Sequence, residues 1–276
     1  MQCTKVVHVL TNYRSNVTCV SVFDGMTTWG PVSGTSQGRT HDSALPVVTM
    51  VGGGQLARMT HQAAIALGQC LRVLAERPTD PAAVVSPDVV IGSHLDLAAL
   101  REAAVGSSAL TFDHEHVPTE HLETLVAEGV TVAPPPEALA YAQDKLAMRR
   151  KLAALNVSIP PFAAVSSSAD VVAFGEEHGW PVVVKAIRGG YDGRGVWMPA
   201  DAAEATRIVE AQEGTPLLVE SKVDLRRELS AMVARSKYGQ GATWPVVETV
   251  QRDGQCAVVI APAPDLSEDA AAAAEN

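Results

Sequence analysis

Residues 47–57 read VVTMVGGGQLA, and this stretch decides the fold class of the chain. Its first five residues form a short apolar run, three glycines end that run, and a helical pattern extends from Gln55 to Leu67. Gly68 is placed to stop the helix. A strand, a glycine turn and a helix in this order predict the first unit of a parallel sheet covered by helices.

The alternation of strand and helix continues beyond this unit. Further apolar runs lie at Cys70–Ala75, Val89–Ile91, Ala109–Phe112 and residues 130–133, and helical patterns fill residues 95–104 and 119–128. Three prolines at residues 134–136 close the region, and a long helical stretch over residues 137–155 follows. We therefore predict an α/β domain over residues 46–135.

The pattern changes after Pro160 and Pro161. Expected elements of this part are a helix over residues 168–178, strands over 181–187, 196–198 and 216–220, and a helix over 202–213. Strand-like runs at residues 228–234, 245–250 and 256–262 then predict an antiparallel sheet. We assign residues 136–276 to a second, α+β domain. Residues 1–45 are predicted to be a poorly structured extension with one weak strand near residues 6–10.

Composition narrows the classes of function. The formal net charge of −10 argues against a nucleic-acid groove and against an anionic membrane surface. No apolar run approaches the roughly 20 residues that a membrane-spanning helix needs. The four cysteines (Cys3, Cys19, Cys70, Cys256) are far apart, which favours a reducing, cytoplasmic compartment over a disulfide framework or a zinc site.

The glycine turn at residues 52–57 is the first candidate site. It fits the G-x-G-x-x-A form of a dinucleotide fingerprint, and Glu76 stands about 20 residues later, where a ribose-binding acid is expected. Glycine amides and the start of a helix together attract an anion. The alternative is a tight turn that binds no ligand.

Residues 111–118 (TFDHEHVP) are the second candidate. Two acids and two histidines follow a strand, at the end of the sheet where open parallel sheets bind ligands. The spacing lacks the helical i, i+4 geometry of a common zinc motif, so a metal site is poorly supported. The alternative is a polar strand exit that caps the next helix, a role that Thr119 also suits.

Lys185 lies inside the apolar run PVVVKAI of residues 181–187 and is the most informative single residue. A buried ammonium is costly unless it meets a negative partner. The loop RGGYDGRG of residues 188–195 follows, with four glycines and two arginines that suit a polyphosphate. A lysine on an edge strand facing water is the alternative. A further candidate is the strand end of residues 216–223 with Glu228, which suits an adenine edge and ribose hydroxyls.

Together these segments resemble the 5-(carboxyamino)imidazole ribonucleotide synthase family of the ATP-grasp superfamily. The resemblance rests on residues 52–59 (GGGQLARM), 111–118, 143–146 (QDKL), and on Val184 and Lys185 with residues 189–195. Their order and spacing match the family over residues 46–276. The implied fold is a Rossmann-like pre-ATP-grasp domain followed by an ATP-grasp domain.

The resemblance also implies an activity and a site. Members use ATP and bicarbonate to carboxylate aminoimidazole ribonucleotide through carboxyphosphate. The implied nucleotide contacts are Lys145, Lys185, the lid residues Gly190, Tyr191, Asp192, Gly193, Arg194, Gly195 and Val196, the adenine hinge Glu220, Ser221, Lys222 and Val223, the ribose acid Glu228, and Gln251. The implied substrate contacts are Gly54, Gln55, Leu56 and Glu115, and the implied catalytic residues are Tyr191, Asp192 and Arg194.

The sequence departs from the family pattern in three ways. Asp113 stands where Glu is usual, and Gln251 stands where many members have His. The family's magnesium carboxylates are expected beyond Asn276, so Mg²⁺ is an implied cofactor with no assigned ligand here. The resemblance further implies a homodimer. Two other functions remain open: an ATP-binding fragment without turnover, and an NAD-dependent oxidoreductase, which would leave Lys185 and its loop without a role.

Overall fold

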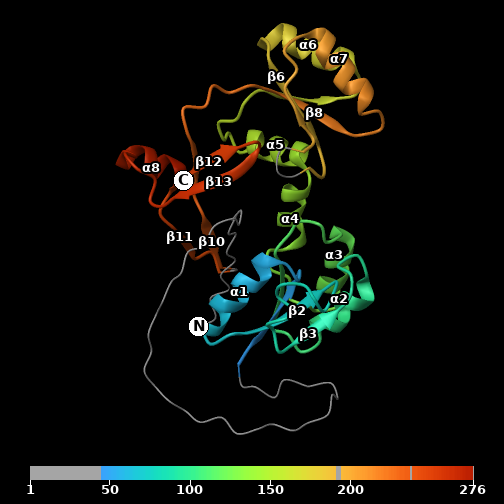
Figure 1. The fold of residues 1–276 in the computed structure, drawn as a ribbon, viewed down its shortest axis with the longest axis vertical. Helices are drawn as coiled ribbons and strands as arrows, with labels where there is room; N and C mark the ends of the chain where they lie inside the picture. The colour runs from blue at the N-terminus through green and yellow to red at the C-terminus, as the bar shows by residue number, and fades with distance from the viewer. Residues whose placement is uncertain (1–44, 191–193, 237, 276) are drawn as a thin grey trace.

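A computed structural model describes residues 45–190, 194–236 and 238–275 (Figure 1). Residues 1–44 of the predicted extension over residues 1–45, including its weak strand, lie outside the described residues. Two sheets, each covered by helices, form the main bodies of the structure, and a smaller strand-rich part follows them (Figure 1). Among the described residues, no helix is long and apolar enough to cross a membrane.

The first sheet is parallel throughout, as predicted. Its strands, in the order β3-β2-β1-β4, are β1 (Val47–Val51), β2 (Cys70–Ala75), β3 (Val89–Ile91) and β4 (Ala109–Phe112). The expected strand at residues 130–133 reduces to a single bridge between Leu110 and Val132. Helix α1 (Gln55–Ala66) packs on one face, and helices α2 (Leu97–Ala104) and α3 (Thr119–Ala127) pack on the other.

The two buried clusters follow from strand periodicity. Along β1, the side chain of Met50 joins the cluster beneath α1, whereas that of Val51 joins the cluster beneath α2 and α3. Successive side chains of a strand point to opposite faces, so a run that is apolar on both faces is buried on both. The sheet is therefore held rigid between two helical layers, and the loops at its carboxyl end are left to form a site.

The predicted long helix over residues 137–155 is wrong, because the chain forms two helices there. Helix α4 (Pro136–Gln143) ends at Asp144, and helix α5 (Lys145–Ala154) begins directly after it. Asp144 has extended backbone angles, and its Oδ1 atom accepts a hydrogen bond from the Ala147 amide at 2.8 Å. The carboxylate caps the new helix, so one residue both ends α4 and starts α5.

The second sheet is antiparallel, with strand order β5-β8-β6-β7. Its strands are β5 (Phe162–Val165), β6 (Val182–Ala186), β7 (Val196–Trp197) and β8 (Leu217–Ser221). Helices α6 (Ser168–His178) and α7 (Ala202–Ala211) cover one face, and their core includes Val182, Val184 and Ala186. The alternate residues of β6, Val183 and Lys185, therefore point to the opposite face. Helix α5 lies on that side of the sheet (Figure 1).

The last part of the chain is antiparallel, as predicted, but the expected single strand over residues 228–234 is two strands. Strands β9 (Glu228–Ser230), β12 (Val247–Arg252) and β13 (Gln255–Ile260) form one sheet. Strands β10 (Val233–Arg235) and β11 (Gly241–Thr243) form a separate hairpin. Two residues between β9 and β10 break the run, because each strand pairs with a different partner. Helix α8 (Glu268–Glu275) ends the described chain.

Candidate functional site

Lys185 lies in an inner strand of the second sheet, between β7 and β8, and not at an edge. Its Nζ atom donates a hydrogen bond to Oε1 of Glu220 on the neighbouring strand β8. Glu220 is only 5% exposed. The negative partner that a buried ammonium requires is therefore present, and both side chains lie on the face of the sheet opposite α6 and α7.

Arg149 of helix α5 is a second partner of Glu220. Its Nε and Nη2 atoms both lie 3.0 Å from Oε2 of the carboxylate. One buried carboxylate therefore meets two cations, one at each oxygen, and the cluster carries a net positive charge. Nothing in the sequence pattern singled out Arg149, because it lies 71 residues from Glu220 and is one of several basic residues on the same helix.

Lys145 brings a further cation to the same region. As the first residue of α5, it donates its backbone amide to the Ile187 carbonyl at 3.0 Å. Its Nζ atom donates to the Gly189 carbonyl at 2.7 Å, at the base of the glycine loop. Burial lowers the pKa of Lys145, and repulsion from Lys185 lowers it further, whereas Glu115 and Asp144 act in the opposite direction. The two predicted phosphate-binding lysines thus lie within electrostatic range of each other.

The glycine loop is closed tightly at its base. The Ala186 amide donates to the Gly195 carbonyl at 2.9 Å. Gly190 has a φ of +79°, and a Cβ atom there would lie 2.5 Å from the carbonyl oxygen of Arg194. Only glycine fits that position without moving the backbone. Tyr191, Asp192 and Gly193, which include two predicted catalytic residues, lie outside the described residues.

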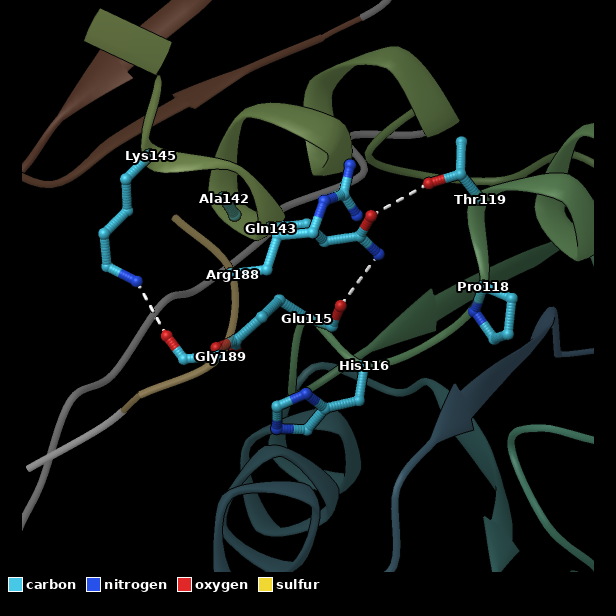
Figure 2. A pocket seen from close by; sticks show the side chains of 9 residues that line it. All are labelled: Glu115, His116, Pro118, Thr119, Ala142, Gln143, Lys145, Arg188 and Gly189. Carbon is cyan, nitrogen blue, oxygen red and sulfur yellow. Dashed lines mark hydrogen bonds between the residues drawn. The ribbon is translucent and has the colours of Figure 1, made fainter. Parts of the chain in front are cut away.

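A polar cavity of about 240 Å³ lies between the loop after β4, the junction of α4 and α5, and the start of the glycine loop after β6 (Figure 2). Its lining residues are Glu115, His116, Pro118, Thr119, Ala142, Gln143, Lys145, Arg188 and Gly189. Figure 2 shows the ammonium of Lys145 directed at Gly189 across this cavity. Arg188 also lines the cavity and pairs with Asp144 at 3.3 Å. Cations of two chain segments therefore line one pocket that also contains the carboxylate of Glu115.

Gln143 joins the two halves of this cavity. Its Nε2 atom donates to the carbonyl oxygens of Glu115 and Val117, each at 2.8 Å, and its Oε1 atom accepts from the Thr119 hydroxyl at 2.9 Å. Thr119 begins α3 but does not cap it through its side chain. The alternative interpretation of Thr119 as a helix cap is therefore not supported, because its hydroxyl donates to Gln143.

A second cavity, of about 620 Å³, lies at the carboxyl ends of β1, β2 and β4. Gly54, Gln55 and Leu56 line it, together with Glu76, Arg77 and Asp80. Glu115 lines the smaller cavity instead. The structure thus divides the four predicted substrate contacts between two cavities, although His116 lines both and places them side by side.

Asp113 occupies the amino-terminal end of α1. Its Oδ2 atom accepts a hydrogen bond from the Ala57 amide at 3.0 Å, and a Cβ atom at Gly52 would lie 1.9 Å from its Oδ1 atom. Burial raises the pKa of Asp113, and the Ala57 hydrogen bond partly opposes that rise. A dinucleotide fingerprint needs this helix end for a phosphate. The carboxylate already there disfavours the NAD-dependent alternative.

Three histidines, His94, His114 and His116, line the larger cavity. The ring centroids of His94 and His114 are 4.8 Å apart, and those of His114 and His116 are 5.4 Å apart. Burial lowers the pKa of His114 to about 4, with further contributions from His94 and His116. Within the described ranges, no three His, Cys, Asp or Glu side chains are arranged to hold a metal ion. The sequence did not indicate His94, because it follows a different strand.

The predicted hinge leaves the second sheet at the end of β8. The Ser221 amide donates to the Pro161 carbonyl at 3.0 Å, and the buried Ser221 hydroxyl has no hydrogen-bond partner among the described residues. Lys222 and Val223 are exposed and lead towards Glu228, the first residue of β9. Gln251 is exposed on β12, opposite Cys256. The side chain of Glu220 is held by the two cations, so only its backbone remains for a hinge.

Known proteins match this arrangement closely. The ribonucleotide synthetase preATP-grasp domain family matches residues 45–143, and the ATP-grasp domain family matches residues 150–276. The N5-carboxyaminoimidazole ribonucleotide synthase of Mycobacterium tuberculosis is 62% identical over 233 residues, which are 84% of this chain and 54% of that protein. The chain belongs to the N5-carboxyaminoimidazole ribonucleotide synthase family.

Solved structures of the N5-carboxyaminoimidazole ribonucleotide synthase family have the same fold. The enzyme from Thermus thermophilus is 32% identical, with a TM-score of 0.75 over 82% of this chain and 61% of that one. The synthase from Aspergillus clavatus, solved in complex with ADP and 5-aminoimidazole ribonucleotide, is 29% identical, with a TM-score of 0.73 over 84% and 60% of the two chains. The chain spans about half the length of the curated relatives it matches.

Proposed function

We propose that this protein is an ATP-grasp ligase that uses ATP and bicarbonate to carboxylate 5-aminoimidazole ribonucleotide to 5-(carboxyamino)imidazole ribonucleotide, in purine biosynthesis. The observation that carries this proposal is the position of Lys145 and Lys185 beside the closed glycine loop. Cations and loop amides are arranged there for a polyphosphate. The Aspergillus clavatus relative, solved with ADP and 5-aminoimidazole ribonucleotide, supports both ligand classes.

The proposed nucleotide site lies on the face of the second sheet that α6 and α7 leave uncovered. Lys145 and Lys185 hold the phosphates, the loop of residues 190–196 closes over them, and residues 220–223 present backbone groups to adenine. Glu228 binds ribose hydroxyls, and Gln251 stays a proposed contact on β12. Tyr191, Asp192 and Arg194 are proposed to act at the reacting groups.

The proposed substrate site is the larger cavity beside Gly54, Gln55 and Leu56. Glu115 faces the smaller cavity, where Lys145 lies, and so stands between the substrate and the phosphates. Carboxyphosphate is the proposed intermediate, and its carbon dioxide joins the exocyclic amine of the substrate. A closing loop has a physical purpose here, because water would hydrolyse that intermediate.

Magnesium is proposed as the ion that neutralises charge on the transferred phosphoryl group. The described residues do not provide a fitting set of protein ligands, so no step is assigned to the ion. The family likeness is also our reason to propose a cytoplasmic homodimer, and to propose domains over residues 46–135 and 136–276.

A thermal-shift series with ATP, NAD and 5-aminoimidazole ribonucleotide tests the proposed function. A ligand that binds the folded state at 100 times its dissociation constant stabilises it by about 2.7 kcal/mol. We expect ATP and the ribonucleotide to raise the Tm and NAD to leave it unchanged. A shift with NAD alone would contradict the proposal. Phosphate release that requires both bicarbonate and the ribonucleotide separates a ligase from a protein that only binds ATP.

A further inference from the structure

We propose that Arg149 is a positioning residue for nucleotide binding: it keeps the buried Glu220 neutralised, so that Lys185 is available to a phosphate. This inference rests on the proposed ATP site, and it concerns a residue that does not itself need to touch the nucleotide. It follows from the fact that Arg149 and Lys185 contact different oxygen atoms of the Glu220 carboxylate.

The two cations use different oxygens of Glu220. Both Nε and Nη2 of Arg149 lie at 3.0 Å from Oε2, whereas Nζ of Lys185 is bonded to Oε1. The contacts therefore do not compete. Lys185 can turn away from Oε1 towards a phosphate while Arg149 keeps its place on Oε2, and the carboxylate is never left without a cation.

Because the carboxylate of Glu220 is buried, it needs a cation beside it at all times. The side chain of Glu220 is 7% exposed, that of Arg149 is 19% exposed and that of Lys185 is 22% exposed. An isolated carboxylate at such a place is strongly unfavourable, because few water molecules reach it. Without Arg149, the whole requirement for a counter-ion would fall on Lys185. The ammonium would then be held at Glu220, and a phosphate would have to compete for it.

Helix α5 links this pair to the other phosphate-binding lysine. Lys145 and Arg149 are four residues apart on α5, so their side chains leave the same side of the helix. Lys145 donates to the Gly189 carbonyl at the base of the glycine loop. Arg149 donates to Glu220 on strand β8 of the second sheet. The helix thus sets the position of one lysine directly and that of Lys185 through Glu220.

A purely structural role for Arg149 is the competing explanation, since the same contact fastens α5 to the sheet. Both explanations predict that Arg149→Met lowers stability. They differ in the Glu220→Gln background, where no charge remains for Arg149 to neutralise. There, the positioning role predicts little further effect of Arg149→Met on nucleotide affinity, whereas fastening of the helix or direct contact predicts a loss that persists.

The experiment is a double-mutant cycle read by calorimetric titration with ATP. We expect Arg149→Met to weaken ATP binding at least about tenfold, which is less than the effect of removing a buried charge that itself contacts the ligand. We expect Arg149→Lys to keep most of the affinity, and the double variant Arg149→Met/Glu220→Gln to bind within about threefold of Glu220→Gln alone. Arg101→Met is the matched control, because Arg101 also pairs with a glutamate, Glu128, but at an exposed position of the first domain. An unchanged affinity of Arg149→Met, or an equal loss in both backgrounds, would overturn the proposal.

A second readout needs no nucleotide and separates this inference from the proposed function. Peptide-mapped acetylation reports how available the amine of Lys185 is in each folded variant. The proposal expects slower acetylation of Lys185 in Arg149→Met than in the wild type, and faster acetylation in both Glu220→Gln variants. Unchanged or faster acetylation in Arg149→Met would overturn it. If acetylation follows this order but the wild type binds no ATP, the proposed function fails and the role of Arg149 towards phosphate fails with it.

Discussion

The Asp113 carboxylate caps helix α1 from a distant part of the chain, since its Oδ2 atom accepts a hydrogen bond from the Ala57 amide at 3.0 Å. Gly54, the residue before the helix, has no side chain to fill this role. The cap ties the glycine turn after β1 to the loop after β4. Two of the loops that line the larger cavity are therefore held together by one half-buried acid.

We predict that Asp113→Asn gains stability relative to the wild type as the pH rises. Burial raises the pKa of Asp113, so its folded state binds a proton more strongly than the unfolded chain does, whose aspartates titrate at about 3.9. The wild type then loses stability as the pH rises from about 4 through that raised pKa. An asparagine keeps an acceptor for Ala57 and never ionises.

Urea unfolding of both proteins at pH 4 and pH 7 measures this effect. Asp170→Asn is a control of opposite sign, because hydrogen bonds from the Ser166 and Ser167 amides lower the pKa of Asp170. The difference between that variant and the wild type should stay nearly constant from pH 7 to pH 4, and below about pH 4 the variant should gain stability relative to the wild type as the pH falls. A stability difference between Asp113→Asn and the wild type that does not change with pH would show that the buried carboxylate carries no desolvation cost.

We predict that His114 makes the fold sensitive to mild acid. Burial, followed by His94 and His116, lowers the pKa of His114 to about 4, whereas an unfolded histidine titrates at about 6.5. Between these values the unfolded state binds more protons, so stability falls as the pH drops from 6.5 towards 4. His114→Asn should lose less stability than the wild type between pH 7.5 and pH 5, by roughly 1–2 kcal/mol. If the denaturant midpoints of His114→Asn and the wild type fall equally between pH 7.5 and pH 5, His114 is not the source of the acid sensitivity.

We predict that Gln143 holds the Glu115 loop on helix α4 through its three side-chain hydrogen bonds. Gln143→Ala should cost about 1–3 kcal/mol in urea unfolding, because two carbonyl groups lose their donor. Gln143→Glu should cost more at neutral pH than in acid, since an ionised carboxylate would face those carbonyl groups. Thr119→Val removes only one of the three hydrogen bonds and should have the smallest effect. If Thr119→Val equals Gln143→Ala, the amide donors contribute nothing.

The sequence was sufficient to predict those features that depend on residues close together in the chain. The run at residues 47–57, with its apolar strand and its glycine turn, correctly predicted a parallel unit. The surroundings of Lys185 indicated an ammonium that needs a negative partner, but the partner expected there was a phosphate and not the carboxylate of Glu220. Hydrophobic periodicity and local backbone requirements decide such features within a few residues.

Partners that meet only after folding were not predictable. Glu220 is 35 residues from Lys185, and Arg149 is 71 residues from Glu220. The break between α4 and α5 at Asp144 was missed, because the sequence there continues a helical pattern without glycine or proline. A capping carboxylate does not interrupt such a pattern, although it allows the chain to turn Lys145 towards the glycine loop.

The central claim is that Lys185 belongs to an ATP site, and calorimetric titration of the wild type and Lys185→Met with ATP tests it most directly. Methionine keeps the aliphatic stem and removes the charge, while Arg149 continues to neutralise Glu220, so we expect the variant to remain folded. Lys151→Met, at an exposed position of α5, is the control and should bind ATP like the wild type. We predict that Lys185→Met binds ATP at least about 30-fold more weakly, the lower end of the effect of removing a buried charge partner. Equal affinities of Lys185→Met and the wild type would contradict the account.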